Sequence, residues 1–333
     1  MTSGPLVILL AITIAWFLLP LLPAIAEWLR PTDVTPLEVV GRDAGDIPLF
    51  ARGFRDYLVT RVAPVTGAPG AAEPRAGGDA GQDRVVILEG RLTLAGGETF
   101  LHEVCALGEL EGGPGALYRA VLAERGLTLG ERSRVLRWVH AAGRLEVGRA
   151  TILQGRASSA IAVQLGRGVA FDRVGAPVIR TEGPPADRPA VAPGSAGRFS
   201  PPEGIRAIGD HLRVDGDLSI TDLTTLESNV VVAGNLRLGA GAVIRGQVKV
   251  HGTATVERGA RIDGSLVGRG ELVIGAGAVI AGPVIAEGKV TLGPGCVIGD
   301  YAAPTTIAAP AVRLGPGVTI HGQVTTQQGG LVD

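Results

Sequence analysis

Histidine, cysteine and closely spaced carboxylates are the side chains that most often carry out catalysis or bind metals, and this chain has few of them at a useful spacing. It contains no HExxH, CxxC, GxSxG or P-loop motif and no GxGxxG after a strand. The charged residues Glu257, Arg261 and Asp263 are typical of a solvated face. The sequence therefore predicts no catalytic residue, no cofactor and no metal site. The histidines lie far apart, at His102, His140, His211, His251 and His321.

The element that positions these residues is a six-residue repeat of aliphatic side chains between Val214 and Ile298. A second repeat of glycines, such as Gly216 and Gly234, has a period of 18 residues. Three six-residue units make 18, so each coil should hold three short strands separated by tight bends. The predicted fold is all-β, a parallel β-helix with about 18 residues per coil. The predicted core residues are Val232, Leu238, Ile244, Val250, Val256, Ile262, Ile274, Ile280, Leu292 and Ile298.

After Ile298 the repeat slips by four residues, which predicts a bulged loop at Tyr301–Pro304. Aromatic residues make up 4% of the chain, as suits a narrow core of stacked aliphatic side chains. The net charge of −1 predicts no attraction to nucleic acid. Two cysteines in 333 residues argue against a disulfide framework and fit a reducing compartment.

Residues 1–28 are predicted to form a transmembrane anchor, because no charge occurs before Glu27 and the apolar stretch is long enough to span a bilayer. A cleaved signal peptide is the rival interpretation, since Ala24–Ala26 resembles a cleavage site, but no basic residue precedes the stretch. Basic residues follow it from Arg30 onward, which favours a cytoplasmic body by the positive-inside rule. The predicted location is the inner membrane, crossed once.

Residues 29–84 are predicted to hold a helix at 48–62 and a flexible spacer at 63–83 rich in Gly, Ala and Pro. Phe54, Tyr57 and Leu58 fall on one face of that helix, which would lie either on anionic lipid or on the folded domain.

Residues 85–180, here called the upstream block, carry a weaker form of the 18-residue spacing, as in Gly130 and Gly148, and are predicted to form a degenerate β-helix. Within them, Leu117–Gly126 would fit a helix, and Trp138–His140 would interrupt the repeat as a bulge or side loop. Residues 181–205 are rich in proline and predict a linker. Residues 206–331 are called the downstream block.

The downstream block resembles the bactofilins, a family of polymer-forming bacterial cytoskeletal proteins, over Leu212–Leu218, Lys289–Leu292 and Val312–Val318. The resemblance implies a right-handed β-helix whose copies assemble end to end into nonpolar filaments without nucleotide. It also implies an inner-membrane scaffold for cell-wall or shape-determining machinery. The terminal coils would carry the assembly interface, because an open stack exposes unpaired strand edges. The candidate end residues are Val214, Leu218, Ile220, Leu314, Ile320 and Val324.

The function expected from these observations is a non-enzymatic, membrane-anchored scaffold that polymerises with copies of itself. The anchor and the upstream block would obstruct one end, so short assemblies are expected as readily as long filaments. A trimeric hexapeptide-repeat acyltransferase is an alternative, because Val273–Ala278 resembles that family's repeat. Its catalytic histidine usually lies on or beside an excursion, and Tyr301–Pro304 holds none. A second alternative is an exported β-helix that binds envelope polysaccharide.

Overall fold

The computed structural model describes Thr13 and residues 49–61, 75–77, 85–184, 197–198, 205–208 and 211–333. The expected membrane anchor at 1–28 lies outside these residues, apart from Thr13. No helix within the described residues is long and apolar enough to cross a membrane. Residues Ile47–Asp333 form one compact unit.

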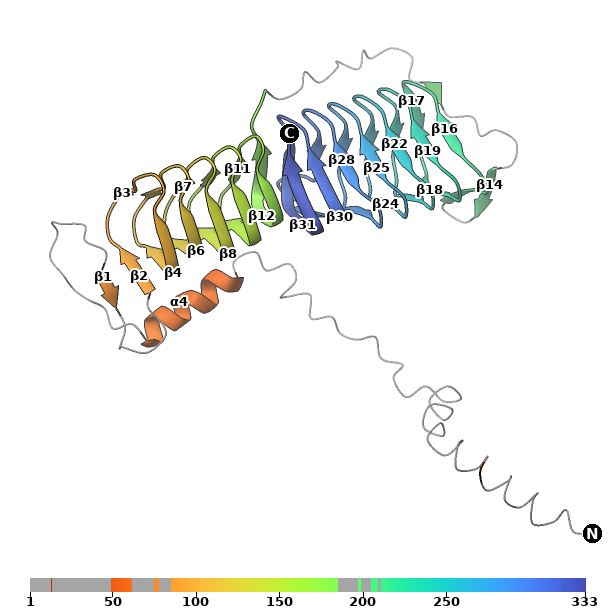
Figure 1. The fold of residues 1–333 in the computed structure, drawn as a ribbon. Helices are drawn as coiled ribbons and strands as arrows, with labels where there is room; N and C mark the ends of the chain where they lie inside the picture. Colours follow the sequence, from red (N-terminus) through yellow and green to blue (C-terminus); the bar gives the residue numbers. More distant parts are fainter. Residues whose placement is uncertain are drawn as a thin grey trace, which may run out of the picture. The chain divides into compact units, whose positions relative to one another are not determined.

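The described strands form a single sheet wound into a parallel β-solenoid of about 12 turns, with ~18 residues in each turn (Figure 1). Within the coils, strands pair with the strand one turn further along the chain, as in Val214 with Val232 and Val232 with Val250. The all-β fold and the coil length are therefore those predicted. The two blocks share this sheet and do not stand apart.

The downstream block follows the predicted repeat closely. In strand β16 (Leu218–Ile220), for example, the two aliphatic residues are buried and Ser219 between them is exposed. The short strand β13 (Gly197–Arg198) precedes the block, and the short strand β14 (Ile205–Ile208) begins it. Its other strands are β15 (His211–Val214), β17 (Thr224–Leu226), β18 (Asn229–Val232), β19 (Leu236–Leu238), β20 (Val243–Ile244), β21 (Val248–Val250), β22 (Ala254–Val256), β23 (Arg261–Ile262), β24 (Leu266–Gly268), β25 (Leu272–Ile274), β26 (Val279–Ile280), β27 (Val284–Ala286), β28 (Val290–Leu292), β29 (Val297–Ile298), β30 (Thr305–Leu314) and β31 (Thr319–Val332).

The ten predicted core residues all lie inside these coils, and none is more than 1% exposed. Glycines close one bend of every coil after the first with a positive φ, for instance 64° at Gly241 and 67° at Gly259, a conformation that a side chain disfavours. Tyr301–Pro304 forms an exposed loop without strand structure, as predicted.

The upstream block has longer strands and less regular coils. Two sequence-based expectations were wrong here. Leu117–Gly126 contains a strand and no helix, and Trp138–His140 lies inside a strand in register with its neighbours. The strands are β2 (Val85–Leu88), β3 (Leu92–Thr93), β4 (Thr99–Ala106), β5 (Leu110–Glu111), β6 (Leu117–Ala123), β7 (Leu127–Leu129), β8 (Arg134–Ala141), β9 (Leu145–Val147), β10 (Ile152–Ser159), β11 (Val163–Leu165) and β12 (Ala170–Thr181).

The predicted helix is present as α4 (Leu49–Arg61). It packs on the upstream block, where Phe54, Tyr57 and Leu58 contact a cluster that contains Cys105 and Leu122. The spacer prediction was partly wrong, because β1 (Arg75–Gly77) pairs with β2; the rest of the spacer lies outside the described residues.

Candidate functional site at the block ends

Antiparallel strand pairing marks the ends of the coil stacks. Every described pairing between successive coils of one block is parallel. The three antiparallel pairs of the described strands are β1 with β2, β14 with β15, and β12 with β31. They lie at the first coil of the upstream block, at the first coil of the downstream block, and between the two last coils. Each of these three places therefore carries one antiparallel strand pair.

The seam between β12 and β31 joins the last coil of one block to the last coil of the other (Figure 1). Ile320 faces Ile179 across it, and Val324 faces Val174. The sequence placed Leu314, Ile320 and Val324 at a free end, but these residues are at most 1% exposed. They form an internal joint, because the upstream block covers the coil on which they lie.

Side chains reinforce the seam. The hydroxyl of Thr181 donates to the carbonyl of Gly315 at 2.8 Å and accepts from the amide of Val318 at 2.8 Å. Thr326 donates to the carbonyl of Asp172 at 2.9 Å. These groups are buried or nearly so, and each has a partner across the seam, so the joint satisfies its own polar atoms.

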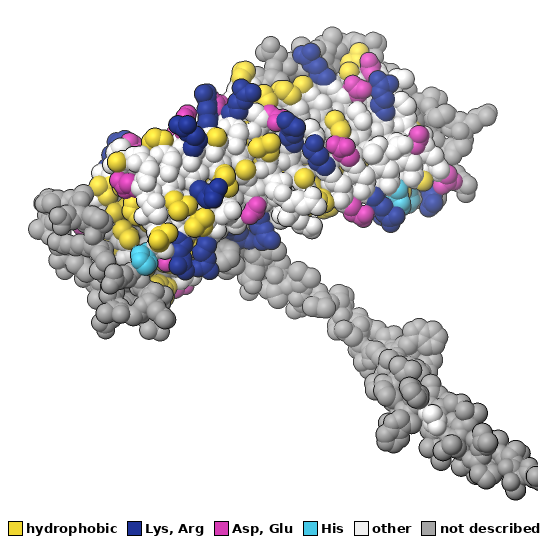
Figure 2. Space-filling model, viewed as in Figure 1, with side chains coloured by type: hydrophobic (Ala, Val, Ile, Leu, Met, Phe, Trp, Pro, Cys, Tyr) yellow, Lys and Arg dark blue, Asp and Glu magenta, His cyan; other side chains and the backbone are white. Residues whose placement is uncertain are grey.

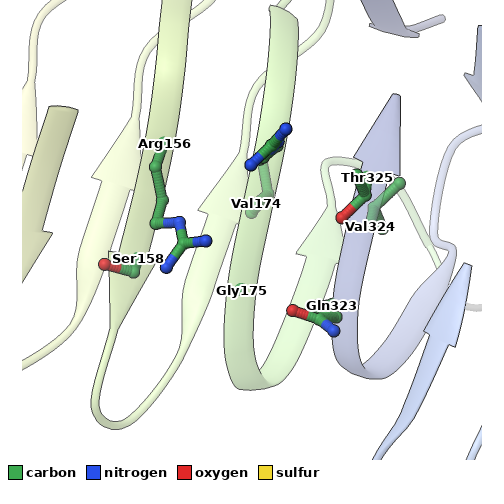
Figure 3. Close-up of a pocket in the computed structure, with 8 residues that line it drawn as sticks. Arg156, Ser158, Val174, Gly175, Gln323, Val324 and Thr325 are labelled. Atoms are coloured by element: carbon green, nitrogen blue, oxygen red, sulfur yellow. The ribbon is translucent and has the colours of Figure 1, made fainter. Parts of the chain in front are cut away.

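A small hollow opens on the seam between β10, β12 and β31 (Figure 3). Arg156 and Arg173 line it together with Ser158 and Gln323. Burial, followed by the neighbouring Arg173 charge, lowers the pKa of Arg156. The hollow has room for about one water molecule, so it does not enclose a cofactor.

The first coil of the downstream block is the other end that the sequence singled out. Val214, Leu218 and Ile220 are 7%, 3% and 1% exposed there. Strand β14 covers the edge of β15, and β13 covers the edge of β17. Among the described strands, β16 pairs with β19 alone, so its outer edge carries no partner from them.

Strand β1 pairs with β2 on the first coil of the upstream block, and α4 packs along the side of this coil and the next ones, against residues of β2, β4, β6 and β8. Arg55 on the helix forms a two-pronged ion pair with Glu124, with Nε–Oε1 at 2.6 Å and Nη2–Oε2 at 2.8 Å. Phe54 meets the ring of Trp138 edge-on at a centroid distance of 5.2 Å. Burial raises the pKa of the neighbouring Cys105 thiol to about 11, so this cysteine is a poor nucleophile.

Sequence reasoning missed a buried polar pair next to the helix. His140 is 2% exposed, and its Nδ1 lies 2.9 Å from the hydroxyl of Ser158. Burial is the main cause that lowers the pKa of His140 to about 4. The two residues are 18 positions apart in sequence, so the coil period itself would have placed them together. The other histidines are exposed or half-buried on separate coils.

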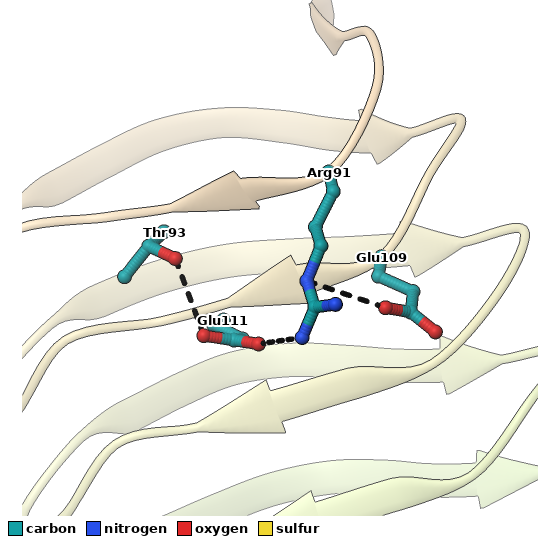
Figure 4. A network of polar contacts seen from close by, with 4 residues as sticks. All are labelled: Arg91, Thr93, Glu109 and Glu111. Carbon is teal, nitrogen blue, oxygen red and sulfur yellow. Dashed lines mark hydrogen bonds and ion pairs between the residues drawn. The ribbon is translucent and has the colours of Figure 1, made fainter.

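The outer surface carries paired charges of both signs (Figure 2). Arg91, for example, contacts Glu111 at 2.7 Å and Glu109 at 3.5 Å, and Thr93 donates to the same Glu111 (Figure 4). Arg261 likewise pairs with Asp263. Such exposed pairs suit a solvated face and contribute little to stability. Within the described residues, no group of three or more metal-binding side chains occurs.

No protein-family model, curated protein or solved structure significantly matches this chain. The described residues offer strand edges and coil ends, which are suited to association with other strands.

Proposed function

We propose that this protein is a non-enzymatic, membrane-anchored scaffold that assembles with copies of itself through the ends of its coil stack. The single observation that carries the proposal is the seam, where β12 of one block pairs with β31 of the other. A coil end of this chain thus accepts a second coil end as its partner. Exposed strand edges recruit further strands in the same way.

The seam between β12 and β31 limits which coil ends can contact another molecule. Both last coils are occupied within one molecule, so contacts between molecules fall to the first coils of the two blocks. The first coil of the upstream block carries β1, and the first coil of the downstream block carries β13 and β14. The resemblance to bactofilins favours the same function. By this resemblance, the assembly is attached to the membrane and recruits cell-envelope machinery.

Electron microscopy of the purified full-length chain tests the proposal. The chain is kept in mild detergent without nucleotide and imaged in negative stain over a concentration series. The expected result is particles longer than one molecule that grow in number or length with concentration. Discrete trimers would overturn the proposal and favour the acyltransferase alternative. Particles of one molecule at every concentration would also overturn it.

Thiol labelling in intact cells tests the location. The two native cysteines are buried, so they contribute little background. Cysteine introduced at the exposed Lys289 is expected to resist a membrane-impermeant probe until the inner membrane is permeabilised. Labelling before permeabilisation would place the body outside and favour the exported polysaccharide-binding alternative.

A further inference from the structure

Two arginines lie side by side at the small hollow on the seam. Arg156 on β10 and Arg173 on β12 are partners in the register of these neighbouring parallel strands, so their side chains leave the same face of the sheet. Figure 3 shows the guanidinium of Arg156 reaching from β10 toward β12, with Gln323 and Thr325 of β31 on the far side of β12. The fold therefore holds two positive charges at one place.

This arrangement costs free energy, because like charges on directly opposite residues of neighbouring strands repel each other. The repulsion is visible at Arg156, whose pKa is lowered by burial and then by the charge of Arg173. Arg173 forms no ion pair with a carboxylate in the described part of the chain. The carboxylate of the adjacent Asp172 accepts from the amide of Gly155 at 2.8 Å. A bound anion would offset the repulsion between the two arginines.

The coils around the hollow are strongly basic. Residues 132–180 contain nine arginines and only two carboxylates, although the whole chain has a net charge of −1. A local excess of positive charge raises the concentration of anions near that surface. The hollow therefore lies where anions accumulate.

The size and the donors of the hollow indicate which anion fits. It has room for about one water molecule, so a phosphate oxygen can enter and a sugar ring or a base cannot. Each guanidinium presents a fork of N–H groups that suits phosphate oxygens, and the hydroxyl of Thr325 lines the same hollow. A tetrahedral phosphate can offer separate oxygens to all three donors, whereas a carboxylate has two. The Nε2 of Gln323 already donates to Thr306 at 3.1 Å.

We propose that Arg156 and Arg173 form a binding site for a phosphate group, with the hydroxyl of Thr325 as the third donor. One phosphate oxygen enters the hollow, and the rest of the ligand stays outside it. The donors come from β10 and β12 of the upstream block and from β31 of the downstream block, so the bound group bridges the seam. Phosphate binding should therefore stabilise the folded chain. A free phosphate compound and the headgroup of phosphatidic acid offer the same chemistry.

Thermal unfolding of the full-length chain in detergent separates these two sources. Sodium phosphate is compared with sodium chloride at equal ionic strength, and micelles that contain phosphatidic acid are compared with micelles that contain phosphatidylcholine. A higher unfolding temperature in phosphate than in chloride would show that a free phosphate group is sufficient. A rise with phosphatidic acid alone would identify the lipid headgroup as the ligand. No rise in either comparison would overturn the inference.

Two substitutions distinguish binding at this site from a general effect of the anion on stability. Arg173→Gln removes a charge at an exposed position, and Thr325→Val removes the hydroxyl while keeping the shape of the side chain. In isothermal titration calorimetry with the ligand that raised the unfolding temperature, Arg173→Gln should weaken binding roughly tenfold or more, and Thr325→Val about threefold or more. In chloride, Arg173→Gln should be at least as stable as the wild-type chain, because it removes the repulsion from Arg156.

Arg180→Gln is the matched control. It removes an exposed charge from the same strand at the same seam, but Arg180 pairs in register with Thr319 and does not line the hollow. Its binding should equal that of the wild-type chain. If Arg173→Gln and Thr325→Val also bind as tightly as the wild-type chain, the inference is overturned. The proposed self-assembly would then still stand, because it does not depend on this site.

Discussion

The ring of Phe171 on β12 lies directly against the backbone of Gly330 on β31. The last coils of the two blocks therefore meet where one coil has a large buried side chain and the other has only a glycine. Phe171 is 2% exposed. A Cβ on Gly330 would overlap three atoms of the ring. The close approach of the two coils thus depends on a glycine at this one position.

Replacement of Gly330 by valine should therefore open the seam. The added side chain has to displace Phe171 or β31, and such overpacking typically costs about 1–3 kcal/mol. Urea unfolding measures the loss. Gly216→Ala is the control, because no atom lies within 4 Å of the position that its Cβ would take. Equal stability of the two variants would contradict the close packing of the two last coils.

Tyr118 offers a substitution that should stabilise the chain. Its ring is buried and stacks on Phe100 at a centroid distance of 5.4 Å, but its hydroxyl has no hydrogen-bond partner among the described residues. Removal of a buried, unsatisfied hydroxyl relieves a desolvation cost, so Tyr118→Phe should raise stability by about 1 kcal/mol in thermal or urea unfolding. Tyr301→Phe, at a position 69% exposed, should change nothing. A destabilised Tyr118→Phe variant would indicate a hydrogen bond to that hydroxyl.

The core of the downstream block was predictable because its period is strict. Each inward position recurs after six residues, and each coil repeats after 18, so the core can be read without knowing any contact. The upstream block breaks this regularity with register shifts, for instance between Phe100 and Glu103 and between Tyr118 and Ala120. Gly130 consequently stacks on Gly113, 17 residues earlier, and not on Gly112. A fixed 18-residue spacing therefore misplaces the glycine at this bend, although it pairs Trp138–His140 correctly with the strands before and after them.

The seam was not predictable from the repeat. Thr181 and Gly315 are separated by 134 residues, and antiparallel pairing of two coil ends has no sequence period. The sequence therefore placed Ile320 at an open end.

Attachment of α4 to the upstream block should depend on the ion pair between Arg55 and Glu124. Both side chains are about one-third exposed, at 34% and 32%, so solvent weakens the pair and a contribution of roughly 0.5–1 kcal/mol is expected. Cys105 packs in the cluster that the helix covers, so its thiol reports when the helix detaches. Glu124→Gln should speed the reaction of Cys105 with a disulfide reagent roughly two- to fivefold.

Cys296 provides the internal control for this experiment, because it lies in the core of the downstream block at 0% exposure. Its thiol should react only when the chain unfolds globally. If Cys105 and Cys296 react at the same rate in the variant, the substitution has lowered the stability of the whole chain, and the ion pair does not act by holding α4 in place. An unchanged rate at Cys105 would show that the apolar contacts alone hold the helix.

The buried His140 should make the stability of the chain depend on pH in a defined window. Burial lowers its pKa from 6.5 to about 4, Arg55 acts in the same direction, and Glu124 opposes them. Between pH 6.5 and about 4 the unfolded chain binds a proton at this histidine and the folded chain does not. The stability contribution is therefore complete above pH 6.5 and is lost as the pH falls, at up to about 1.4 kcal/mol per pH unit.

Urea unfolding at several pH values between 4 and 7 measures this effect as the difference between the wild-type chain and His140→Asn. The variant keeps an amide that can face Ser158 but cannot take up the proton, so its stability should fall less steeply on acidification. Ser158→Ala is the matched control. Burial, and not the hydrogen bond to Ser158, is the main cause of the lowered pKa, so this control should retain the wild-type slope. Parallel curves for the wild-type chain and His140→Asn would contradict a histidine that is kept neutral by burial.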